Sequence, residues 1–236
     1  MKFQFDSNAS SPIKAVALVC DLEDFAKFFS QPDVHLYIPK LLNRIFDSLN
    51  TCIYGGKAYW IEESPHLESL SAPLCTKFLG DGALFLWRYE GKEENTLQVH
   101  DIERLMNRLS SLQKGFHKVI AQCTDEVPLS MLPPRIRFGI AAGSVYRINY
   151  HHNTQEEYLG YVINLASRLQ SYCKSIGFLA SARLELPEKM LQEAGYRKVL
   201  AKNLRGFPQE LVIVDAEDYA LLDSRERREL FDEEIF

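Results

Sequence analysis

Two aspartates stand where a folded chain can bring their carboxylates together. Asp21 follows an apolar run, residues 15–20, that is typical of a buried strand. Asp81 lies in a Gly-Asp-Gly turn that precedes a second apolar run, residues 83–87. If the two segments pair, the carboxylates meet, and two meeting carboxylates repel each other unless a cation joins them. The pattern therefore predicts a site for a divalent metal ion.

A second pair of polar residues has helical spacing. Asn164 and Arg168 are four residues apart in an apolar-periodic segment that follows Leu159 and Gly160. This spacing places both side chains on one face of a helix. An amide and a guanidinium near the start of a helix are suited to hold a sugar and a phosphate.

The elements that must position these residues follow from the hydrophobic pattern. The predicted strands are residues 14–20, 57–61, 74–79, 83–87, 135–142, 144–148, 197–201, 210–214 and a strand near Phe178. The predicted helices are residues 24–30, 34–50, 96–121, 161–173, 181–194 and 223–234. Residues 62–73 read as a loop, and residues 149–157 as the tip of a long hairpin. This order predicts an α/β sandwich with a mainly antiparallel sheet.

Composition limits the classes of function. The chain has 236 residues, 46% of them hydrophobic, which suits one globular domain. Its net charge is −5 without a basic block, so we expect no sequence-independent binding to nucleic acid. The five cysteines show no Cys-x-x-Cys spacing and read as reduced thiols. With neither a signal peptide nor a membrane-length apolar stretch, a soluble cytoplasmic protein without direct membrane insertion is expected.

Four short sequences, taken in order, resemble one family. They are Val-Cys-Asp at 19–21, Lys-Phe-Leu-Gly-Asp at 77–81, the glycine-containing strand at 135–143 and the helix start at 158–169. Together they resemble the catalytic domain of class III nucleotidyl cyclases, over roughly residues 14–214. The resemblance implies a ferredoxin-like α/β fold. It predicts a leader at 1–13, a catalytic domain at 14–215 and a charged helical tail at 216–236.

The resemblance also implies a role for each matching residue. Asp21, Asp81 and the backbone carbonyl of Leu22 would hold two divalent cations, Mn²⁺ or Mg²⁺. Of the remaining positions, Lys77 and Glu157 would read the base, Asn164 would orient the ribose, Arg168 would stabilise the transition state and Arg205 would bind the triphosphate. Glu156, the adjacent residue, is an equally good candidate for the base-reading role given to Glu157. A triphosphate would then be cyclised by attack of the ribose 3′-oxygen on the α-phosphorus, with pyrophosphate leaving.

In this family each active site is shared by two protomers. The metal aspartates come from one protomer, and the base-reading pair, the asparagine and the arginine come from its partner. One such domain per chain therefore implies a homodimer with two composite sites. Lys77 and Asp81, four residues apart, would serve different sites.

The base is left open by the residues themselves. A lysine donor and a carboxylate acceptor suit adenine, uracil or cytosine. Because Glu157, Tyr161 and Ala26 replace more common residues and no sensor module is attached, the chain resembles the stand-alone pyrimidine cyclases of bacterial Pycsar antiphage systems. That resemblance favours UTP and cyclic UMP, with an effector protein activated by the product. Tyr54 or Tyr59 is a candidate wall of the base pocket.

Other functions fit the same residues less well. A cytidylate or adenylate cyclase is the nearest alternative, and a non-catalytic domain that binds nucleotide or a partner is the alternative of another class. The retention of both aspartates, Lys77, Asn164 and Arg168 argues against the latter. A diguanylate cyclase is disfavoured because its Gly-Gly-Asp/Glu-Glu-Phe signature is missing.

Overall fold

The central element of the fold is a large, mainly antiparallel sheet. The computed structural model describes residues 11–124, 126–149 and 156–232, and within them ten strands join in the order β12-β10-β11-β9-β7-β1-β5-β4, with β6 beside β5 and β8 beside β7. These strands are β1 (Ile13–Leu22), β4 (Cys75–Phe78), β5 (Gly82–Tyr89), β6 (Thr96–Leu97), β7 (Ile136–Ile148), β8 (Glu157–Leu159), β9 (Phe178–Ser181), β10 (Tyr196–Leu204), β11 (Phe207–Asp215) and β12 (Phe231–Asp232). The pairs β7–β9 and β5–β6 are parallel, and the other pairs are antiparallel. The predicted α/β fold with a mainly antiparallel sheet is thereby confirmed.

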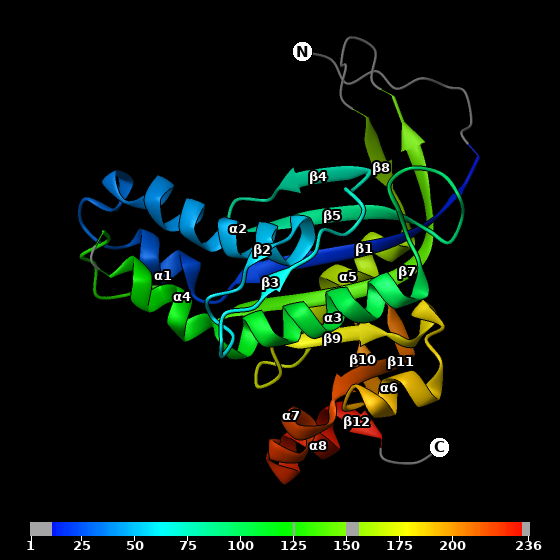
Figure 1. Ribbon diagram of the computed structural model, residues 1–236. Coiled ribbons are helices and arrows are strands. Elements are labelled where there is room, and N and C mark those ends of the chain that lie inside the picture. The colour runs from blue at the N-terminus through cyan, green and yellow to red at the C-terminus, as the bar shows by residue number, and fades with distance from the viewer. Residues whose placement is uncertain (1–10, 125, 150–155, 233–236) are drawn as a thin grey trace.

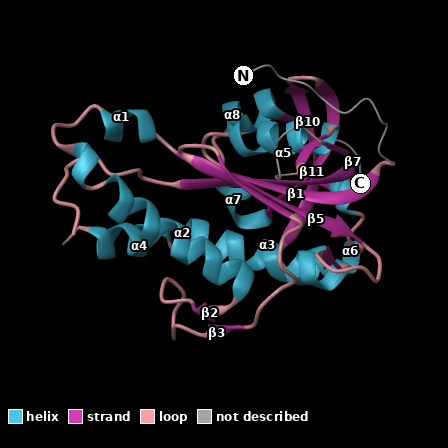
Figure 2. Cartoon of the chain, turned by 90° about the horizontal axis from the view of Figure 1, so that it is seen from above, coloured by secondary structure: helices cyan, strands magenta, loops and turns pink. Residues whose placement is uncertain are grey.

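Helices cover both faces of this sheet (Figure 1). They are α1 (Phe25–Phe29), α2 (Ile38–Tyr54), α3 (Val99–Lys114), α4 (Phe116–Cys123), α5 (Tyr161–Tyr172), α6 (Glu188–Glu193), α7 (Ala216–Leu221) and α8 (Ser224–Leu230). Figure 2 shows α2, α3 and α4 on one side of β1 and β5, and α5 on the other side. The sheet therefore has an apolar core on each face.

Strand β1 lies inside the sheet, between β7 and β5, and is buried on both faces. Val16, Leu18 and Cys20 pack in the core with α2 and α3, whereas Ala17 and Val19 pack in the core with α5. This is why the run is continuously apolar instead of alternating with polar residues. The same alternation puts the side chain of residue 21, the next in the series, on the face that α5 covers.

The predicted strand at 57–61 is wrong. Here β2 (Gly56–Lys57) pairs with β3 (His66–Leu67) in a separate two-stranded sheet, and the chain then turns. Ala58 and Trp60 are buried in the helix-side core. The backbone of Trp60 passes so close to Gly115 that a Cβ there would lie 2.9 Å from the Trp60 oxygen. Gly115 also divides the predicted helix 96–121 into α3 and α4.

Other predicted elements differ at their ends. The predicted hairpin at 74–87 is confirmed as β4 and β5. The two strands predicted at 135–148 are one strand, β7, which continues through Gly143. The helix predicted at 181–194 is divided before Pro187 into a 3₁₀ turn (Ala182–Leu184) and α6. The first ten residues of the predicted leader, the centre of the loop at 149–157 and residues 233–236 lie outside the described residues.

The C-terminal segment packs against the domain. After α7, helix α8 ends at Leu230, and β12 pairs with β10 through Ala201 and Phe231. Tyr219 and Phe231 are buried and their rings contact each other edge to face. In the part of the chain that the structure describes, none of the helices has the length and apolar character needed to cross a bilayer.

Candidate active site

The structure brings Asp21 and Asp81 together at one end of the sheet. Asp21 is opposite Gly82 in the β1–β5 pairing, and the Leu22 amide donates to the Asp81 carbonyl oxygen at 2.9 Å. The strands approach closely at this point, since a Cβ on Gly82 would lie 1.9 Å from the Cys20 oxygen. Gly82 is therefore required for the turn to place Asp81 beside Asp21.

Two further side chains hold Asp21, and sequence reasoning missed both. Arg137 stands directly opposite Asp21 in the β1–β7 pairing and forms an ion pair with its Oδ2. Gln170, on α5, donates to the same oxygen at 3.0 Å. The alternation Arg135-Ile136-Arg137 was a signal for the arginine, because a polar residue between buried positions of a central strand needs a partner.

The electrostatics of Asp21 favour a cation. Burial raises the pKa of Asp21 above its usual value; the Arg137 guanidinium acts to lower it, and the neighbouring charge of Asp81 acts to raise it. A divalent cation between the carboxylates would remove that repulsion, so the donor set fits Mg²⁺ or Mn²⁺. Among the described residues no group of three or more His, Cys, Asp or Glu forms a metal cluster. Two carboxylates together with backbone oxygen, such as that of Leu22, would supply the protein ligands.

The predicted base-reading pair is also brought together. Lys77 on β4 forms an ion pair with Glu157 on β8, and both side chains are partly buried. Glu156 instead accepts hydrogen bonds from Arg147 at 2.8 Å and from the Tyr158 hydroxyl at 2.5 Å. The Tyr158 hydroxyl and Arg147 lower the pKa of Glu156. The contact with Lys77 therefore distinguishes Glu157 from Glu156 as the candidate partner in the base-reading pair.

The helix α5 carries the other two predicted residues on its outer face. Asn164 and Arg168 are exposed, whereas Gln170 faces the sheet and is 7% exposed. Arg205 is exposed in the turn between β10 and β11. Among the described residues, no hydrogen bond or ion pair joins the side chains of Asn164, Arg168 or Arg205 to the aspartates or to Lys77. Within one chain, the residues predicted for one active site therefore do not meet: Asn164, Arg168 and Arg205 lie apart from the aspartates and from Lys77.

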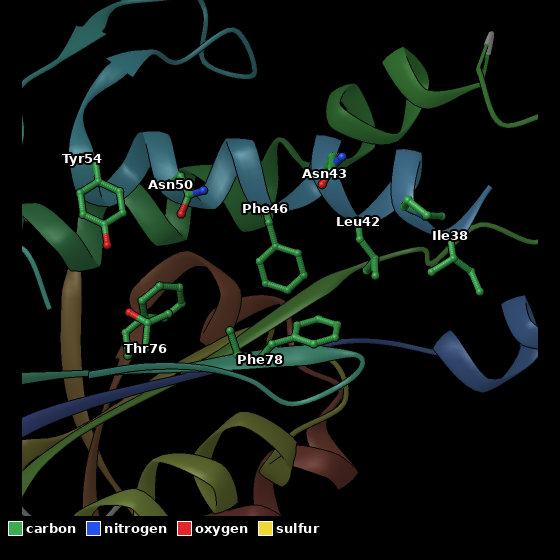
Figure 3. Close-up of a pocket in the computed structure, with 11 residues that line it drawn as sticks. Ile38, Leu42, Asn43, Phe46, Asn50, Tyr54, Thr76 and Phe78 are labelled. Carbon is green, nitrogen blue, oxygen red and sulfur yellow. The ribbon is translucent and has the colours of Figure 1, made fainter. Parts of the chain in front are cut away.

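An apolar groove adjoins Asp81 on the face of the sheet that α2 covers. A cavity of about 390 Å³ adjoins Asp81 and is lined by Phe25, Phe29 and Leu79. A second cavity, of about 510 Å³, continues it between α2 and β4 and shares Phe78 with it. Figure 3 shows Phe46 on α2 and Phe78 on β4 pointing toward each other in the lining of this second cavity, where their rings contact edge to face.

Neither tyrosine proposed as a pocket wall lies beside the base-reading pair. Tyr54 lines the groove between α2 and β4 (Figure 3), on the face of β4 that carries Thr76 and Phe78. Lys77, between these two residues, points to the other face. Tyr59 forms a hydrogen bond of 2.9 Å with Ser48 and packs against Trp60.

Comparison with known proteins identifies the fold. No family model matches the sequence, and no curated protein matches it. The guanylyl cyclase Cya2 is similar in structure, with a TM-score of 0.58 and 22% identity over 88% of this chain and 93% of that one. The adenylyl cyclase CyaB from P. aeruginosa has a TM-score of 0.58 and 18% identity over 92% and 97% of the two chains. An adenylate cyclase from Trypanosoma brucei has a TM-score of 0.52 and 17% identity over 88% and 93%. The chain therefore has the fold of class III nucleotidyl cyclase catalytic domains.

Proposed function

We propose that the chain is a nucleotidyl cyclase that converts a ribonucleoside triphosphate to its 3′,5′-cyclic monophosphate and pyrophosphate. The observation that carries the proposal is the contact between the strand end at Asp21 and the turn at Asp81, which places two carboxylates together. The ion pair between Lys77 and Glu157 supports it, because it provides a donor and an acceptor side by side for a base. The structural neighbours named above are adenylyl and guanylyl cyclases.

The residues divide the reaction between them. The ribose 3′-oxygen forms a bond to the α-phosphorus, the bond from that phosphorus to the bridging oxygen breaks, and pyrophosphate leaves while the 3′ proton passes to solvent. Divalent cations held by Asp21, Asp81 and the Leu22 carbonyl would lower the pKa of the 3′-hydroxyl and neutralise the leaving charge. Asn164 would orient the ribose, and Arg168 would place positive charge where negative charge develops on the phosphoryl oxygens. Arg205 would contact the triphosphate.

The site would be completed by a second copy of the chain. Asn164 and Arg168 lie on an exposed face and have no contact with the chain's own aspartates, so a partner's aspartates are the natural complement. The turn that carries Asp81 also exposes apolar side chains, with Phe78 59% and Leu79 52% exposed. Such exposed apolar residues are typical of an interaction surface. We therefore propose a symmetric homodimer with two composite sites.

The finer proposal concerns the base. Lys77 would donate to a base carbonyl, and Glu157 would accept from the adjacent N3–H of uracil, giving cyclic UMP from UTP. Cytosine and adenine offer other donor–acceptor pairs to the same residues, so CTP and ATP are the competing substrates. By resemblance to the pyrimidine cyclases, the product would act in antiviral defence through a separate effector protein.

The test is a comparison of the four ribonucleoside triphosphates. The purified full-length chain is incubated with Mn²⁺ and each triphosphate, and cyclic product and pyrophosphate are measured together. We expect cyclic UMP as the main product. A product from ATP or CTP alone would reassign the base, and tight nucleotide binding without any cyclic product would replace the enzyme proposal with a non-catalytic nucleotide-binding domain.

Arg137 should compete with the metal ion when no nucleotide is bound. Its positive charge lies beside Asp21 and would repel a cation at the other carboxylate oxygen, so Arg137→Gln should strengthen Mn²⁺ binding to the nucleotide-free chain about tenfold, which corresponds to about 1.4 kcal/mol. Isothermal titration at pH 8 measures this affinity. The matched control is Arg135→Gln, because Arg135 pairs with Glu23 at 2.6 Å instead of with Asp21. Equal affinities for the two variants would contradict the competition.

A further inference from the structure

Gln170 joins two parts of the molecule that the proposed reaction uses separately. It lies on α5, is 7% exposed and donates from Nε2 to Oδ2 of Asp21 at 3.0 Å. It occurs two residues after Arg168, which is about 200° around a helix, so it faces the sheet while Arg168 faces outward. A single helix therefore carries Arg168 on one side and Gln170, the hydrogen-bond donor to Asp21, on the other.

The short distance between α5 and the sheet makes this contact possible. Gly139 on β7 lies under the helix, and a Cβ there would be 2.0 Å from the Ala166 oxygen and 2.6 Å from the Gln170 nitrogen. Any side chain at position 139 would push α5 away from the sheet. The helix backbone therefore lies directly on β7 at Gly139. Gly139 pairs with Val19 on β1, and Asp21, which Gln170 contacts, is two residues after Val19.

Arg137 and Gln170 together use only one of the two carboxylate oxygens of Asp21. Arg137 and Gln170 both donate to Oδ2. A carboxylate oxygen has two lone pairs, so these two donors use both. The other oxygen, Oδ1, is then the one available to a cation, and the two donors fix its direction.

We propose that Gln170 is a positioning residue that couples the two active sites of the dimer. This rests on the proposed function, in which the Asp21 of one chain serves one site while Asn164 and Arg168 of that chain serve the other. Gln170 is the direct link between them: a cation that fixes Asp21 also fixes α5, and with it the arginine presented to the other site. Linkage makes the effect reciprocal, so a nucleotide bound against Arg168 favours metal binding at Asp21 of the same chain.

The first test measures the link without any turnover. Hydrogen exchange of the α5 amides is followed with and without Mn²⁺ in the full-length wild type and in Gln170→Met, which keeps the side-chain length but removes the donor. We expect Mn²⁺ to slow exchange in residues 161–172 of the wild type at least about fivefold, as a coupling of ordinary size would, and to have no such effect in the variant. The matched control is Gln192→Met, at an exposed position on α6, which should behave as the wild type.

The second test measures the consequence for catalysis. The rate should depend more steeply on Mn²⁺ in the wild type and in Gln192→Met than in Gln170→Met, which should keep only the cooperativity that two cations within one site produce. If Gln170→Met does not fold, Gln170→Asn, which keeps the amide but is one methylene shorter, takes its place. Mn²⁺-dependent protection of α5 that persists in the Gln170 variant would overturn the proposal, as would a wild type whose α5 does not respond to Mn²⁺. A wild type that shows the protection but makes no cyclic nucleotide would instead refute the proposed function.

Discussion

Chains carrying Asp81→Ala and chains carrying Arg168→Ala should each be inactive alone and should regain activity when they are co-expressed. In the mixed dimer, the Arg168→Ala chain supplies intact aspartates to one site, and the Asp81→Ala chain supplies an intact arginine to that same site. The second site lacks both groups. Cyclic nucleotide formation by the purified mixture measures the recovery.

The size of the effect follows from what each group does. Loss of a group that stabilises transition-state charge costs about 10²- to 10³-fold in rate, so each parent should lie at least that far below the wild type. With equal amounts of the two chains, half of the dimers are mixed and each holds one intact site of two. The expected recovery is therefore about one quarter of the wild-type rate per chain.

A matched mixture separates sharing from simple restoration of folding. Asp81→Ala chains mixed with Asp21→Ala chains carry the same number of substitutions, but every site then lacks one aspartate. This mixture should stay inactive. Absence of recovery in the first mixture, or equal recovery in both, would contradict the composite site.

Local sequence was sufficient for the parts of the site that depend on short-range geometry. The apolar run before Asp21 and the Gly-Asp-Gly turn around Asp81 predict a central strand and a hairpin, and the pairing of β1 with β5 joins them. The helix with Asn164 and Arg168 follows from its period and from the glycine before it. In each case a few neighbouring residues determine the element, so the pattern is enough.

The rest depends on how elements approach each other, which no local pattern records. Gln170 reaches Asp21 because Gly139 lets α5 rest on β7, a contact between residues far apart in the sequence. The strand expected at 57–61 has a suitable composition. However, the packing of Trp60 over Gly115 places this segment with the helices instead of in the sheet. Tertiary packing overrides strand propensity at such a position.

The contact between Lys77 and Glu157 has a consequence for base selection. The two side chains neutralise each other in the nucleotide-free chain, so a base must offer an acceptor to Lys77 and a donor to Glu157 to replace what they lose. A base that lacks either group would leave a partly buried charge without a partner. Discrimination between bases therefore depends on both members of the pair.

Glu157→Gln should reduce the preference for one base more than it reduces binding of nucleotides in general. A hydrogen bond to a charged group contributes about 1.5–3 kcal/mol, so kcat/KM for the preferred triphosphate should fall about 10- to 150-fold. The values for triphosphates that the wild type uses poorly should change much less, because a base that the pair does not hold has no contact with Glu157 to lose. The matched control is Glu156→Gln, since the adjacent carboxylate binds Arg147 and Tyr158 instead of Lys77 and should leave the order of preference unchanged. Competition between triphosphates in one reaction, with the cyclic products separated, gives the ratios directly. An equal loss for all four triphosphates would show that Glu157 supports the fold of the site without reading the base.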